Sequence, residues 1–486
     1  MNSIAGTDTM VPADRNVVID VLRAGALLCV VVGHWLMQGV FIDGAGDPHR
    51  LGLLGLAPWS HPLTWVMQVM PIFFLAGGYA NGVSWRRARR RRITYGTWLH
   101  RRTRRLAWPL IPLVALWSAV TVLAEPLGLD PAWVRIAGRA SLVPVWFLAA
   151  YLLVIALVPV TLRLWDRLGV ASIVAGLVLA GAVDVVSLNG GGDALGAVNV
   201  LVVWTTMHQV GYAWLDGTLR GRRRGLLMLG ASLTTLCLLV WAGPYGVSMV
   251  GLDGHGVDNT SPPRVTLLVL GLAQAAVAVL AERRVRQLAS RRVVWSVTVL
   301  VASRLMTIYL WHLTVLGLLL GLAMWTGHGL TAVPDTAAWW RAVPGWLAVL
   351  AVATAVVTRC VEPFERVPLR WQLVPTWWAL TEVLAVSAGA AALARWGLVP
   401  PADLPAWVLP SAVTVVVLVV ARGGGRRGTQ VDRAAGDLRP STTAGPDPIL
   451  ATRPDPSEDD HDDPRLSARR PRSRPDGSAA PPRERG

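Results

Sequence analysis

The sequence contains no lysine, so all 46 of its basic residues are arginines, and only three of its 486 residues are cysteines. Cys29, Cys237 and Cys360 lie in or at the end of apolar stretches, and their spacing matches no metal motif, so we expect small buried side chains. No G-x-S-x-G elbow, P-loop or dinucleotide fingerprint is present, and the histidines do not cluster at metal-ligand spacing. These absences argue against a soluble hydrolase and predict no metal.

The composition is apolar and basic at once. Hydrophobic residues make up 53% of the chain, its mean hydropathy is +0.46, and its formal net charge is +16. Such hydropathy is typical of a polytopic membrane protein. The arginines occur in short clusters between apolar segments, as orientation in a membrane requires, and no nucleic-acid motif is present. We therefore expect membrane lipids, and no nucleic acid, as partners.

Apolar stretches long enough to cross a bilayer recur along the chain. We predict twelve spans, at 16–38, 61–84, 106–124, 145–165, 168–188, 196–216, 226–243, 264–281, 300–325, 344–363, 374–394 and 404–421. A segment near 291–302 is predicted as a short piece leading into the ninth span. The predicted fold class is an all-α polytopic membrane protein, with a bundle of about ten core transmembrane helices and about two extra C-terminal helices.

Four regions are predicted. A short cytoplasmic N-terminus (1–14) precedes a membrane domain (15–370), two additional transmembrane helices (371–421) and a tail (422–486). The tail is rich in Pro, Gly, Asp and Arg, with thirteen arginines and eleven acidic residues, and we expect it to be disordered. Because no soluble catalytic domain is expected, any enzyme activity must lie in the helical bundle.

The arginine clusters predict orientation. They lie at 86–105, 163–167, 220–224, 283–292 and 359–370, which all fall on one side if the spans alternate. The positive-inside rule then places these clusters and both termini in the cytoplasm, with the protein in the plasma membrane.

Ionisable side chains in the first span are the main candidates for chemistry. Asp20, Arg23 and His34 share roughly one face of one helix, with Arg23 and His34 about 16 Å apart along its axis. Ionisable groups in hydrocarbon are expensive and mark functional sites, and a neutral imidazole accepts a proton near neutral pH. His34 is thus a candidate general base. The alternative is a packing pair in which Asp20 neutralises Arg23.

These residues also carry a resemblance. Asp20-x-x-Arg23 followed by His34 resembles the first-helix signature of membrane acyltransferase family 3, whose members O-acylate saccharides and other acceptors. Five further stretches match in order: Pro71 to Tyr79, Arg102-Thr103-Arg104-Arg105-Leu106 with Pro109, Trp146-Phe147-Leu148, Ser303 with Ile308-Tyr309-Leu310-Trp311-His312, and Glu362-Pro363-Phe364. The resemblance covers roughly residues 15–370. It departs at Ala76, where the family usually has serine, and this puts a hydroxyl role there in doubt.

The resemblance implies an acyl transfer through the membrane. Cytoplasmic acyl-CoA would be the co-substrate, with no permanently bound cofactor, and a saccharide or lipid-linked hydroxyl the acceptor. The phosphates of acyl-CoA would bind Arg102 and Arg105, which match the family spacing, with Arg101 and Arg104 beside them, since guanidinium groups pair well with phosphate. The alternative for these arginines is membrane orientation alone. Other possible site residues are Tyr309, His312, Ser303, Trp146 and Glu362.

Two other classes of function remain open at the level of the sequence. Intramembrane Asp, Arg and His also suit a transporter or flippase for a polar lipid or saccharide, although we find no internal repeat. A sensor or scaffold that uses the tail for interaction is the third reading.

Overall fold

Long helices make up most of the structure, a computed structural model that describes residues 16–398 except 38–39, 43–47, 51, 130, 252–256, 328–331 and 366–372, together with 410, 411, 413, 414 and 417. These residues belong to one unit, 1–428. The predicted N-terminal segment 1–14, the tail 422–486 and most of the predicted span 404–421 lie outside the described residues.

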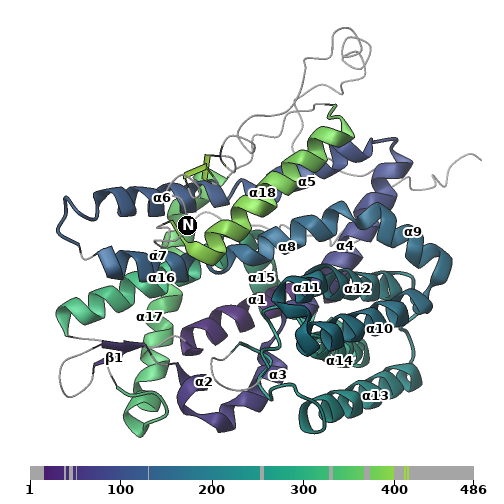
Figure 1. Ribbon diagram of the computed structural model, residues 1–486, viewed down its shortest axis with the longest axis horizontal. Helices are drawn as coiled ribbons and strands as arrows, with labels where there is room; N and C mark the ends of the chain where they lie inside the picture. Colours follow the sequence, from purple (N-terminus) through teal and green to yellow (C-terminus); the bar gives the residue numbers. More distant parts are fainter. Residues whose placement is uncertain are drawn as a thin grey trace, which may run out of the picture. The chain divides into compact units, whose positions relative to one another are not determined.

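Most of the elements follow one another after a few residues, and the connection between α13 and α14 is longer (Figure 1). In chain order they are α1 (Val17–Met37), β1 (Val40–Ile42), β2 (Pro48–Arg50), α2 (Leu53–Leu56), η1 (Pro58–Leu63), α3 (Thr64–Met67), α4 (Met70–Arg90), α5 (Tyr95–Ala107), α6 (Leu110–Leu123), α7 (Pro131–Leu142), α8 (Val145–Ala156), α9 (Val158–Leu168), α10 (Val170–Val186), η2 (Ser187–Gly191), α11 (Gly192–Gly196), α12 (Val198–Leu215), α13 (Arg222–Trp241), α14 (Val265–Ala289), α15 (Arg292–Ser303), α16 (Leu305–Thr326), α17 (Ala337–Val361), η3 (Glu362–Glu365) and α18 (Thr376–Trp396). The two strands form one short antiparallel hairpin.

The helices confirm a polytopic membrane protein. Within the described residues, nine helical segments are long and apolar enough to cross a membrane, and α5 with α6, bent by 41°, would make a tenth. The predicted span 196–216 corresponds to α12, which is not apolar enough to be one of these nine membrane-length segments. This helix lies mostly buried and packs against α4, α10 and α14, so its polar side chains do not face lipid.

The structure differs from the expected fourth span, 145–165. The apolar segment instead runs from 134 to 156, and the chain begins a new helix, α9, at Val158. Pro159 in the first turn of α9 is compatible with a helix start but not with continuation of α8. The expected short piece at 291–302 is present as α15, and it ends at Arg304, before α16.

Glycines let α4 and α12 approach closely. A Cβ atom added at Gly78 would lie 2.0 Å from the carbonyl oxygen of His208, and one at Gly211 would lie 2.2 Å from that of Leu75. Small residues at helix contacts are the usual means of close packing in membranes. Beside this contact, Phe74 stacks on Trp204 with ring centroids 4.4 Å apart, so the centre of the bundle is filled by aromatic rings.

Asp184 of α10 is completely buried and joins several elements. One of its carboxylate oxygens, Oδ1, accepts from Asn199 at 2.8 Å and from the Arg264 guanidinium at 3.3 Å. The other, Oδ2, accepts from the Tyr245 hydroxyl at 3.0 Å and from the backbone N–H of Val265 at 2.8 Å. Burial and the nearby Asp184 carboxylate raise the pKa of Tyr245 above its ordinary value, which keeps its hydroxyl a donor.

We expect Asp184→Ala to lower the free energy of unfolding, because Asp184 joins several elements of the fold. Breaking a buried ion pair from one side typically costs about 3–5 kcal/mol, because the partner stays buried and unpaired. The thermal midpoint of the detergent-solubilised protein, followed by size-exclusion chromatography, measures the loss. Asp184→Asn keeps part of the hydrogen bonding and is expected to lose less; equal midpoints for wild type and Asp184→Ala would contradict this role.

Candidate active site

The first helix holds the three residues expected there. Asp20 lies in the first turn of α1, where the helix dipole favours an acidic side chain, and Arg23 and His34 are half-buried further along. Asp20 and Arg23 lie three residues apart on α1, the spacing that the packing-pair alternative requires.

His34 meets His312 of α16. Nδ1 of His34 lies 2.8 Å from Nε2 of His312, and the two rings are nearly parallel, with centroids 5.1 Å apart and 8° between their planes. His312 is completely buried. The sequence singled out both histidines, but it did not indicate that they touch across 278 positions of the chain.

Hydrogen-bond partners determine which ring nitrogen carries each proton when both rings are neutral. Nδ1 of His312 lies 2.7 Å from the carbonyl oxygen of Tyr309, which only accepts, so this nitrogen carries the proton. Nε2 of His312 is then an acceptor, and Nδ1 of His34 must donate to it. The lone pair of His34 consequently lies on Nε2, on the far side of its ring from His312.

The neighbourhood of the pair is held by further hydrogen bonds. The indole N–H of Trp35 donates to the carbonyl oxygen of His312 at 3.3 Å, which ties α1 to α16 a second time. The hydroxyl of Tyr309 donates to the carbonyl oxygen of Pro144 at 2.9 Å. Tyr309 therefore supports the histidine pair through its backbone, while its hydroxyl is already engaged by α8.

Arginines of α5 lie close to Arg23. Arg102 is half-buried, with its guanidinium 5.3 Å from the ring centre of Trp98, and it lies within electrostatic range of Arg23, Arg105 and Tyr151. Neither Arg102 nor Arg105 makes an ion pair with a carboxylate in the described part of the chain. Uncompensated positive charge at the edge of a low-dielectric interior attracts anions. These arginines from α1 and α5 thus form a candidate anion site.

The other two arginines of the expected donor set differ from these. Arg104 is 5% exposed and packs against Trp108, and Arg101 is half-buried. Arg86, at the end of α4, is committed to structure: its guanidinium lies 2.5 Å from Asp216 and 3.2 Å from Asp166. The hydrogen bond from Arg86 holds the pKa of Asp216 below its usual value.

A polar network beside Arg102 was not fully expected from the sequence. Asn81 of α4 donates to the Tyr151 hydroxyl at 3.3 Å and to Nε2 of His208 at 3.0 Å, and the other nitrogen of His208 lies 3.0 Å from the Tyr212 hydroxyl. His208, Asn81 and Tyr151 are not among the candidate site residues that the sequence indicates. An asparagine inside the apolar segment 61–84 was the available signal.

The remaining candidates contact residues other than His34 and His312. Ser303 donates to the carbonyl oxygen of Leu300, and Trp146 packs against Phe147 and Trp204. Glu362 lies 3.4 Å from Arg304, an ion pair that ties η3 to the start of α16. These contacts point to structural roles. The neighbouring Glu365, which the sequence analysis did not identify, accepts hydrogen bonds from Trp311 at 3.3 Å and from Thr307.

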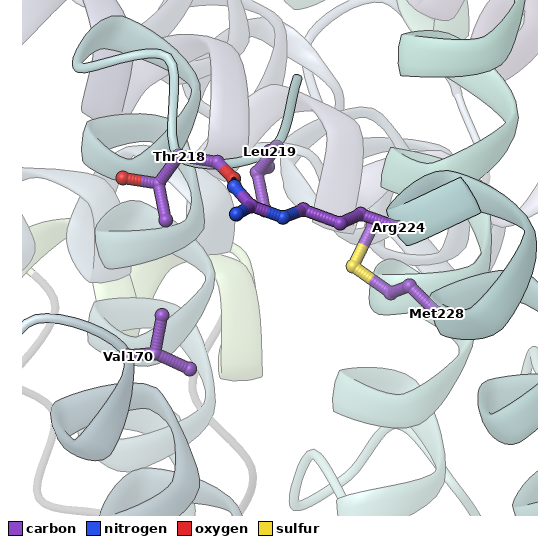
Figure 2. Close-up of a pocket in the computed structure, with 5 residues that line it drawn as sticks. All are labelled: Val170, Thr218, Leu219, Arg224 and Met228. Carbon is purple, nitrogen blue, oxygen red and sulfur yellow. Dashed lines mark hydrogen bonds between the residues drawn. The ribbon is translucent and has the colours of Figure 1, made fainter. Parts of the chain in front are cut away.

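A cavity of about 350 Å³ lies between the ends of α10, α12 and α13 (Figure 2). It is lined by Val170, Thr218, Leu219, Arg224 and Met228, none of which is a candidate site residue. Arg224 donates to the carbonyl oxygen of Thr218, so its guanidinium is partly engaged. No group of three or more metal-ligating side chains occurs among the described residues.

The comparison with protein families decides the class of the protein. A model described as an acyltransferase domain, that of acyltransferase family 3, matches residues 16–359. The chain belongs to acyltransferase family 3. It is therefore a multi-pass membrane O-acyltransferase, as the motif resemblance indicated. No curated protein and no solved structure matched the chain.

Proposed function

We propose that this family 3 acyltransferase moves an acyl group from cytoplasmic acyl-CoA to a hydroxyl of a saccharide, glycolipid or glycosylated small molecule. The observation that carries the proposal is the hydrogen-bonded chain from the Tyr309 carbonyl through His312 to His34. It leaves Nε2 of His34 as a lone-pair acceptor. A buried partner that fixes the tautomer of a catalytic imidazole is a common arrangement in general base catalysis.

The reaction follows from this assignment. Nε2 of His34 takes the proton of the acceptor hydroxyl as its oxygen attacks the thioester carbonyl carbon. The carbon–sulfur bond then breaks, the acyl group stays on the acceptor oxygen, and the CoA thiolate leaves and takes up the proton as the free thiol. His312 accepts a hydrogen bond from Nδ1 of His34 before and after this proton transfer, so it keeps Nε2 of the neutral ring free for the acceptor and stabilises the imidazolium that forms.

The arginines supply the donor site in this proposal. Acyl-CoA is an anion with several phosphates, and Arg102 lies within electrostatic range of both Arg105 and Arg23, so positive charge gathers at one place. Guanidinium groups bind phosphate through paired hydrogen bonds. The positive-inside rule supports a plasma-membrane orientation with α5 and both termini on the cytoplasmic side. The α5 arginines would then be accessible to cytoplasmic acyl-CoA.

An aromatic surface next to the C-terminal turn of α1 supports a saccharide acceptor. Trp59 and Trp340 are 54% and 41% exposed, and both of their indole N–H groups donate to the carboxylate of Asp335. Trp339 packs in a small cluster that Leu36 of α1 also contacts. Fixed, exposed indole faces offer an apolar surface for the C–H face of a sugar ring.

Transfer by the purified protein tests the proposed function. Detergent-solubilised protein is incubated with radiolabelled acetyl-CoA and an envelope extract of a deletion strain, and the label is expected in a glycan or glycolipid. Mass spectrometry of the same fractions should show an acyl mass that the deletion strain has lost. Unchanged envelope glycans and lipids in that strain would contradict an envelope saccharide as acceptor.

A further inference from the structure

Helix α18 lies outside the segment that matches the family model, which ends at residue 359. It nevertheless packs against α5 and α8, and Figure 1 shows it running alongside α5. Eight of its residues are buried: Ala379, Glu382, Val383, Val386, Ser387, Gly389, Ala390 and Leu393. One of these is a carboxylate, which an apolar helix seldom buries without a partner.

The partner is His100 of α5. Nδ1 of His100 lies 2.6 Å from Oε2 of Glu382, and their side chains are 5% and 0% exposed. The second carboxylate oxygen of Glu382 has no hydrogen-bond partner, and neither has Nε of Arg104, which lies within electrostatic range of this carboxylate. His100 and Arg104 of α5 therefore both interact with the Glu382 carboxylate of α18.

The backbones of the two helices also meet. A Cβ atom added at Gly96 would lie 2.3 Å from the carbonyl oxygen of Val374, so only glycine permits this approach. The backbone N–H of Val374 donates to the Thr97 hydroxyl at 3.1 Å. The start of α18 is thus fixed against the start of α5, about one helical turn before His100 on α5.

These contacts use one face of α5, on which Arg104 also lies, and Arg102 and Arg105 use the other. At about 100° per residue, Gly96, Thr97 and Arg104 lie within roughly 60° of His100, whereas Arg102 and Arg105 lie about 160° and 140° away from it. Locking His100 to α18 therefore fixes the rotation that turns Arg102 towards Arg23 and Tyr151.

We propose that Glu382 is a positioning residue for the acyl-CoA donor site: through His100 it holds α5 in the rotation that presents Arg102 and Arg105. The inference rests on the proposed donor site. It assigns to α18, beyond the family-matched segment, a part in donor binding and none in the histidine chemistry.

The test compares Glu382→Ala, Glu382→Gln and wild type as full-length protein in detergent. Calorimetric titration with CoA is expected to give a dissociation constant about five- to tenfold higher for Glu382→Ala, since His100 loses its buried partner. The rate of CoA release at saturating acetyl-CoA should change by less than about twofold, because the histidine pair is untouched. Glu382→Gln keeps an acceptor for His100 and should recover most of the affinity. The matched control is Thr381→Ala, an exposed neighbour on α18.

Hydrogen exchange separates failure of this inference from failure of the proposed function. Residues 95–107 should exchange faster in Glu382→Ala, and residues 222–241 should not. If wild type binds CoA and Glu382→Ala binds it equally tightly, the inference is overturned while the donor site stands. If wild type binds no CoA, the proposed donor site fails, and unchanged exchange in α5 would overturn the positioning role as well. Should Glu382→Ala not fold, His100→Leu with Glu382→Leu, an apolar replacement of the pair, provides the same measurements.

Discussion

Replacing His34 by alanine is expected to lower kcat for acyl transfer by about 10²- to 10⁴-fold, the usual contribution of a general base. Binding of acyl-CoA should change little, because the donor arginines lie on α5 and at the other end of α1. Transfer of radiolabelled acetyl groups to acceptor, measured at saturating acetyl-CoA, checks the expectation.

The partner histidine provides a graded comparison. His312→Ala leaves the base in place but removes the acceptor for Nδ1 of His34, so we expect a smaller loss, about tenfold or more. Cys29→Ala is the matched control: it changes a half-buried side chain of the same helix that contacts Met67, and activity should stay within about twofold. Full transfer by His34→Ala would remove this residue from the mechanism.

Removal of the donor arginines should have the second-largest effect. Arg102→Ala combined with Arg105→Ala is expected to raise the KM for acetyl-CoA by about 10- to 100-fold, since a hydrogen bond to a charged group contributes roughly 1.5–3 kcal/mol. Arg102→Lys should recover only part of the loss, because an ammonium group lacks the planar pair of donors. Steady-state kinetics over a range of acetyl-CoA concentrations measures both.

A charge-matched control distinguishes donor binding from membrane orientation. Arg89→Ala with Arg90→Ala removes two exposed arginines of the same arginine cluster, 86–105, and the KM should then stay unchanged. The increase for the Arg102 and Arg105 variant should also diminish at high salt, because screening weakens wild-type binding first. Equal KM values for the two double variants would leave orientation as the role of the α5 arginines.

Local sequence patterns were sufficient for much of the fold. Helices appeared close to the predicted spans because apolar length is a property of each segment alone, and the family emerged from six short motifs in order. The expected span at 145–165 was misplaced because the apolar run continues past Pro159, where a new helix begins, while the membrane-length segment extends back across Pro144 to residue 134. Helix α12 was predicted as a span, but nothing local indicated that it lies inside the bundle.

In the candidate site, too, single residues could be predicted from the sequence but their contacts could not. Asp20, Arg23 and His34 were recognisable because ionisable groups in an apolar segment are expensive wherever the fold places them. Asn81 was available as a polar residue in an apolar segment, but its role, like that of Tyr151, depends on neighbours that the sequence does not give. His100 and Glu382 were missed for a further reason: each lies in a different predicted region, and only their contact makes either one notable.

The sequence by itself determined the class of this protein, an all-α membrane acyltransferase, and the residue types available to it, because hydropathy and motif order are carried by neighbouring residues. Tertiary structure alone decided that His34 faces His312, that Arg23 joins the arginines of α5, and that α18 holds α5 through Glu382. Each of these contacts joins residues far apart in the chain. Proton position, charge clustering and helix rotation depend on such distances, and no spacing along the sequence encodes them.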